Sequence, residues 1–194
     1  MTTSEDLWLH VIGDAKELLI TSGLFMPLVT HFSRDLDEIS ARRRDTVLFL
    51  RGHLGRHIVL IVTRLHASRP KRETTGVTAS IETVLEYARE ESRISQSAAG
   101  DFKSRLSQLR TNADLDGANW QDFTTFRNAE LAHSLHRSSV DPDSTLLSSN
   151  VLELAYNTYE LVLDLEKAIG RHPPSLSSWY HTALNRGATF WDGL

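Results

Sequence analysis

The chain has 194 residues, of which 40% are hydrophobic and 24% are charged, and its formal net charge is −4. These proportions are typical of one globular domain with a full core, and they exclude a disordered or fibrous chain. The acidic balance argues against a protein that binds nucleic acid over its whole surface, and the absence of cysteine excludes disulfides, thiolate metal sites and cysteine nucleophiles.

At the N-terminus, MTTSEDLWLH contains neither the basic segment nor the apolar segment of a signal peptide. Apolar positions at helical spacing then predict a helix over 5–31, which we expect Gly23 and Pro27 to break or bend. The longest apolar run, at 57–65, is far shorter than the roughly 20 residues that a membrane-spanning helix needs. We therefore expect a cytoplasmic protein with no membrane segment.

A long helix is predicted over 36–67, where Gly52 and Gly55 weaken the middle by up to about 1 kcal/mol each relative to alanine, or mark a close backbone contact. The region is also basic. From Arg34 to Arg72 there are ten Lys or Arg and four acids, an excess of +6, so the rest of the chain carries about −10 by subtraction from −4. This basic stretch is either a phosphate-facing surface or a set of solvated arginines that pair with acids elsewhere.

After a loop at 68–76, helical periodicity continues to the end of the chain. Further helices are predicted at 77–93, 98–111, 120–137 after a cap at Asn119, 146–169 before a terminating Gly170, and in the tail. Because no strand pattern or repeat is found, we predict an all-α antiparallel helical bundle with a short C-terminal helical appendage. Residues 1–194 form one domain in this prediction, with a core over 35–170 on which helix 1–32 and tail 175–194 pack.

The segment TTFRNAELAHSLHR, at 124–137, carries the most informative pattern. On a helical wheel, Arg127 falls between Phe123 and Leu131, on a stripe that should be buried, and a charge there needs a partner or a phosphate. One interpretation is that Arg127 pairs with Glu130, one turn later, and that His133 is a satisfied core histidine. The other is that both belong to a site. They lie about 120° apart and about 9 Å along the axis, so one helix alone does not bring them together.

Two histidine pairs have the spacing of metal ligands on one helix face: His53 with His57, and His133 with His136. The first pair has no glutamate in an HExxH arrangement, and the second has no obvious third ligand. We interpret these histidines as packing or surface groups, and we expect no metal and no cofactor.

RNAELAHS, at 127–134, resembles the motif of the HEPN superfamily, in which Arg precedes Asn, Asp or His and the catalytic His follows the Arg by four to six residues. Arg127, Asn128 and His133 match these three positions. The long-helix, loop and helix block HIVLIVTRLHASRP and TTGVTASIETVLEYARE resembles the abortive-infection branch of the superfamily. The resemblance covers roughly 35–170.

The resemblance implies a HEPN-like bundle and a metal-independent endoribonuclease of a phage-defence or toxin–antitoxin type. It implies a homodimer whose two motifs face one cleft, with His133 moving a proton, Arg127 binding the scissile phosphate and Asn128 holding a neighbouring group. Glu130 and His136 are expected to support the site.

The expected partner is RNA, bound in part through three consecutive arginines, Arg42, Arg43 and Arg44. No nucleotidyltransferase-like antitoxin is fused to the chain, so such a partner is a separate protein. The alternative function is a non-catalytic HEPN-like helical dimer that binds a protein or a nucleotide. The environment of Arg127 and His133 distinguishes the two.

Overall fold

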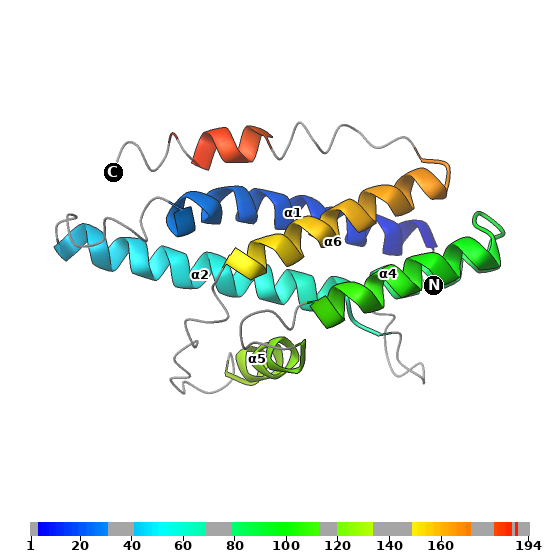
Figure 1. Cartoon of the computed structure of the whole chain (residues 1–194), viewed down its shortest axis with the longest axis horizontal. Coiled ribbons are helices and arrows are strands. Elements are labelled where there is room, and N and C mark those ends of the chain that lie inside the picture. The colour runs from blue at the N-terminus through cyan, green and yellow to red at the C-terminus, as the bar shows by residue number, and fades with distance from the viewer. Residues whose placement is uncertain are drawn as a thin grey trace.

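The structure, a computed structural model, describes residues 4–30, 41–68, 79–112, 120–133, 149–171, 181–187 and 189. The labelled helices are α1 (Ser4–Thr30), α2 (Ala41–Leu65), α3 (Ile81–Glu90), α4 (Gln96–Asn112), α5 (Trp120–His133) and α6 (Ser149–Ala168). A short helix follows at 181–187, and the described residues contain no strand. The predicted all-α bundle is therefore confirmed (Figure 1).

Helix α1 contributes directly to the core. It packs against α2, α3 and α6, and its side chains Val11, Leu18 and Phe25 are completely buried. The expected break at Gly23 or Pro27 is absent, because α1 continues through both residues. Apolar burial along the whole helix outweighs the cost of a proline in its last turns.

The short C-terminal helix lies beside α1, and two glycines allow the close approach (Figure 1). A Cβ built on Gly23 would lie 2.7 Å from the Cβ of Ala183, and one built on Gly187 would lie 2.6 Å from the carbonyl oxygen of Gly23. Real Cβ atoms do not come this close to other atoms. The tail therefore packs on α1 through Gly23, Ala183 and Gly187. From the apolar side chains of the tail we predict docking through Trp179, Leu184, Phe190 and Trp191; Leu184 is half-buried, and the other three lie outside the described residues.

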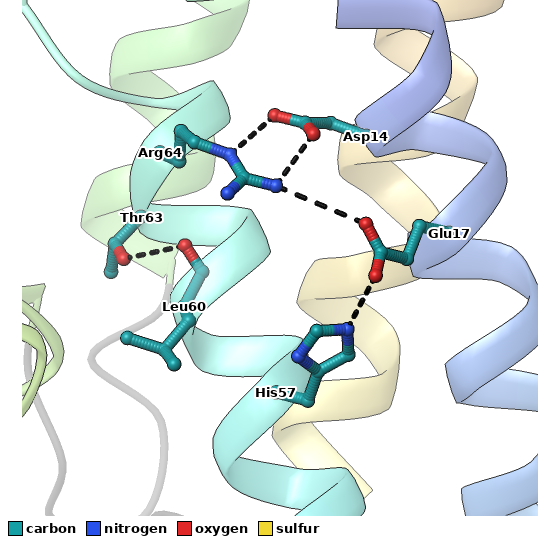
Figure 2. A network of polar contacts seen from close by, with 6 residues as sticks. All are labelled: Asp14, Glu17, His57, Leu60, Thr63 and Arg64. Atoms are coloured by element: carbon teal, nitrogen blue, oxygen red, sulfur yellow. Dashed lines mark hydrogen bonds and ion pairs between the residues drawn. The ribbon is translucent and has the colours of Figure 1, made fainter. Parts of the chain in front are cut away.

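Helices α1 and α2 are joined along one edge by polar contacts (Figure 2). The Arg64 guanidinium donates to both carboxylate oxygens of Asp14 at 2.5 Å, and the ring of His57 lies 2.8 Å from Glu17. Because the later residue of α1 meets the earlier residue of α2, the two helices are antiparallel. These pairs are partly exposed, so each contributes no more than about 1 kcal/mol, and their main effect is to fix the register of the two helices.

Of the two glycines in the middle of α2, Gly52 does not mark a close contact, since a Cβ built on it would meet nothing within 4 Å; for Gly55 the expectation stays a prediction. By length and composition alone, Arg44–Leu65 could cross a membrane, with a mean hydropathy of 1.2. That stretch is longer than the 57–65 run considered above. The core helix of a soluble protein passes the same test, and Ile58, Ile61, Val62 and Leu65 are buried in the core cluster. The chain is therefore not a clear membrane protein.

Local signals define two helix boundaries. Ser80 caps α3, because its side chain accepts a hydrogen bond from the backbone N–H of Thr83. Beyond α6, Gly170 has a φ of 78°, its N–H bonds the carbonyl of Lys167, and the next N–H bonds the carbonyl of Glu166. This pair of bonds is a Schellman motif, which needs a left-handed residue where glycine stands. The predicted end of this helix at Gly170 is confirmed.

Candidate functional site on α5

Helix α5 carries the Arg-Asn-x4-His motif and packs against α2. In Figure 1 it is seen almost end-on beside α2, whereas α1, α2, α4 and α6 extend across the view. Phe123 faces the core and is 3% exposed. Arg127, one turn later, is half-buried, and Asn128 is exposed. The predicted stripe is therefore buried at Phe123 and only half-buried at Arg127.

The Arg127 side chain contacts its neighbour in the motif. Its Nε and Nη2 atoms donate to Oδ1 of Asn128, at 3.2 and 2.9 Å. The acceptor is a neutral amide, so this contact orients the guanidinium without cancelling its charge. Both N–H groups of Nη1 take no part in the contact with Asn128, and an arginine fork of this kind binds phosphate oxygens in a bidentate manner.

Several residues of the predicted site can be placed only in part. His133 is the last residue of α5, so its backbone is described, but its side chain and that of Glu130 are not. His136 lies outside the described residues. The distance between the Arg127 guanidinium and the His133 ring, and the predicted Arg127–Glu130 pair, therefore stay predictions.

Four arginines of the basic stretch lie at opposite ends of α2. Arg42 and Arg43 lie in the first turn of α2, and their side chains are outside the described part; Arg44 follows and is half-buried. At the other end of α2, Arg64 is paired with Asp14. The interpretation that basic residues of 34–72 pair with acids elsewhere thus applies to Arg64.

The two histidines of the α2 pair have different contacts. His57 contacts Glu17, whereas the ring of His53 contacts Phe49. Among the described residues, no group of three His, Asp or Glu side chains could hold a metal ion. The two histidines on α2 therefore have other partners.

The N-terminus of α5 is anchored by residues that the sequence analysis did not identify. The ring of Trp120 lies 5.1 Å from that of His66, just beyond α2, and 6.2 Å from that of Phe123. The Arg110 guanidinium, on α4, lies 5.9 Å from the centre of the Trp120 ring and donates through Nη2 to the carbonyl oxygen of His66 at 2.5 Å. We call His66, Arg110, Trp120 and Thr158 the α5 anchor.

His66 is neutral in this environment. It is 1% exposed, and burial lowers its pKa to about 3, with the nearby Arg110 charge acting in the same direction. Its Nε2 lies 2.8 Å from Oγ1 of Thr158, whose own hydroxyl donates to the carbonyl of Leu154 at 2.7 Å. Since that hydroxyl proton is used, Nε2 carries the proton of the ring and donates to Thr158. Nδ1 has no hydrogen-bond partner in the part of the chain that the structure describes.

Arg110 completes the anchor. Burial lowers its pKa, and the Glu82 carboxylate, 3.8 Å away on α3, acts in the opposite direction. Its bond to the His66 carbonyl satisfies an acceptor at the end of α2, where the helix dipole favours a cation. One sequence signal for His66 existed, because it follows Val62 by four residues on the apolar side of α2. No local pattern indicated that Arg110 or Trp120 would meet it.

No family model, curated protein or solved structure matches the chain.

Proposed function

We propose that the protein is a metal-independent endoribonuclease that cleaves RNA through Arg127, Asn128 and His133. The observation that carries this proposal is the Arg127–Asn128 contact on α5. Two nitrogens of this half-buried guanidinium donate to a neutral amide, and this contact orients the group without adding a negative charge beside it. Such a group is suited to a phosphate, whereas an architectural arginine is usually paired with a carboxylate.

RNA supplies its own nucleophile, the 2′-hydroxyl, so the protein needs only to move protons and to stabilise charge. In the proposal, His133 removes the 2′-hydroxyl proton or protonates the leaving 5′-oxygen, because the pKa of histidine lies near working pH. Arg127 binds the scissile phosphate and the charge that develops on it. Asn128 holds the guanidinium in place. The products are a 2′,3′-cyclic phosphate and a 5′-hydroxyl.

The protein acts as a homodimer in this proposal, because the motif residues lie about 120° apart around one helix. A two-fold axis that places two α5 helices face to face brings Arg127 of one protomer near His133 of its partner. The setting we propose is the cytoplasm, in phage defence or as the toxin of a toxin–antitoxin pair whose nucleotidyltransferase-like antitoxin is a separate protein.

The test is cleavage of a fluorescently labelled RNA in EDTA by the wild type, His133→Ala and Arg127→Ala. We expect His133→Ala to lower the rate by about 10²–10⁴, the usual contribution of a general acid–base group. Arg127→Ala should abolish cleavage and change the free energy of unfolding by no more than about 1 kcal/mol, because its described partner is neutral and exposed.

The scaffold alternative predicts the opposite for the same two variants. If the wild type cuts no RNA and Arg127→Ala lowers the melting temperature by many degrees, the arginine is architectural and the nuclease proposal is wrong. Light scattering supplies the control for the dimer. A monomer at micromolar concentration with full cleavage activity would contradict the two-fold site.

A further inference from the structure

An aromatic pair projects from the N-terminal half of α2. Phe49 is 63% exposed, and His53, one turn later, is also exposed. Their ring centres lie 4.6 Å apart in a T-shaped arrangement with an interplanar angle of 90°. The pair contributes little to the core, yet it holds a large aromatic surface in water in a fixed geometry. An exposed Phe of this kind is a common element of a binding surface.

Asp45 lies one turn before Phe49, and arginines lie farther along α2 on both sides of the pair. Arg42, Phe49 and Arg56 follow one another at seven-residue intervals on α2, so they occupy one stripe of the helix at steps of about 10 Å. The helix as a whole contains six arginines and one acid, Asp45, for a net charge of +5 in a chain whose net charge is −4. The aromatic pair therefore lies in the most cationic element of an acidic protein.

Acids of helix α1 meet the C-terminal half of α2. Asp14 and Glu17 of α1 meet Arg64 and His57 in the C-terminal half of α2 (Figure 2). Because the helices are antiparallel, the N-terminal half of α2 lies toward the end of α1. There, from 18 to 30, α1 contains no charged residue. Helix α1 therefore contributes no acid to the surface around Phe49.

We propose that Phe49 and His53 form a stacking platform for a base of single-stranded RNA, with phosphates of the same strand bound by the neighbouring arginines. This inference rests on the proposed function and extends it, since it restricts the substrate to RNA with unpaired bases. Only an unstacked base can lie on an aromatic side chain, whereas bases in a duplex are stacked on each other. Arginine and aromatic groups alternating along a groove or helix are the usual elements of single-strand binding.

The experiment uses the full-length His133→Ala protein, in which cleavage is suppressed, with and without Phe49→Ala. The probe is a short single-stranded RNA that contains one 2-aminopurine, and the same strand annealed to its complement. We expect the single strand to bind with quenched 2-aminopurine fluorescence. Phe49→Ala should weaken binding about 5- to 150-fold, the value of one base stack, and relieve the quenching. Phe49→Trp should restore both.

Leu48→Ala is the matched control. Leu48 is 46% exposed and directly precedes Phe49, but it points about 100° away around the helix. The proposal is overturned if Leu48→Ala and Phe49→Ala weaken RNA binding equally, or if neither variant weakens it. It is overturned as well if the His133→Ala protein does not bind the single strand, or binds the duplex as tightly as the single strand. Two further results overturn it. In one, Phe49→Ala weakens self-association of the protein and changes RNA binding only through that loss. In the other, Phe49→Ala abolishes binding to anionic lipid vesicles and leaves RNA binding unchanged.

The outcomes separate this inference from the proposed function. Phe49-dependent single-strand binding by a wild type that never cuts RNA would retain the platform and reject the nuclease. Cleavage that requires His133 but not Phe49, with unchanged RNA affinity, would retain the nuclease and reject the platform.

Discussion

Replacement of His66 in the α5 anchor should change how stability depends on pH. In the folded chain the pKa of His66 is about 3, because the ring is buried and lies near Arg110, whereas the unfolded value is about 6.5. Between pH 6.5 and pH 3, His66 is therefore mostly protonated in the unfolded state and mostly neutral in the folded state. The stability that comes from a neutral His66 is complete above pH 6.5 and is lost as the pH falls from 6.5 toward 3. At pH 5, the difference of about 1.5 units corresponds to about 2 kcal/mol.

The variant for this measurement is His66→Gln, because a glutamine amide can still donate to Thr158 and does not titrate. Urea unfolding, followed by tryptophan fluorescence at pH 8 and pH 5, gives four free energies. The wild type should lose about 2 kcal/mol more than His66→Gln between these pH values, and Trp120 should report early loosening of α5 because its ring contacts His66. Subtracting the stability change of one protein from that of the other removes the contribution of groups that titrate in both. Glu166, whose pKa is raised by burial, is one such group. If the two proteins lose the same stability, His66 is not held neutral, and the reasoning is refuted.

Two further predictions concern α1 and the motif. Gly23→Ala should lower the free energy of unfolding by about 1–3 kcal/mol, because the new Cβ would overlap Ala183. Gly13→Ala should raise it by about 0.5–1 kcal/mol, because a Cβ there meets nothing within 4 Å. Urea unfolding measures both variants, and a gain in stability at both positions would mean that the terminal helix does not pack at Gly23. Asn128→Asp should lower the RNA cleavage rate about 10- to 100-fold, because a carboxylate would pair with Arg127 and compete with the phosphate. Unchanged cleavage by this variant, measured beside the wild type, would show that the charge of Arg127 is not used.

Helix positions and ends were accessible from the sequence because they depend on local properties. Apolar spacing located α4 to within two residues, predicted at 98–111 and found at Gln96–Asn112. The end of α6 at Gly170 was predicted because only a residue that tolerates a positive φ closes a Schellman motif easily. Of the break or bend expected in α1, the break was wrong, because the local cost of proline and glycine in a helix is exceeded by burial along the whole helix.

For the candidate site, the sequence identified the residue types and their order but not their partners. It placed Arg127 on the side of α5 that faces the protein and left two partners open, Glu130 and a phosphate. The structure adds a third, Asn128, directly beside it. The sequence gives no signal for this contact, because adjacent side chains on a helix diverge and only the length of the arginine side chain allows it to reach its neighbour.

The sequence by itself determined the helical class, the absence of thiol chemistry, the positive charge of α2 and the Arg-Asn-x4-His order, because each is a property of composition or of spacing along one helix. Only the tertiary structure decided that His66, Arg110 and Trp120 meet at the start of α5 and that Gly23 packs against Ala183. It also decided that Asp14 and Glu17 of α1 meet Arg64 and His57 of α2. Those facts depend on which helix faces are brought together and in which register, and that choice minimises the free energy of the whole core rather than of any one segment.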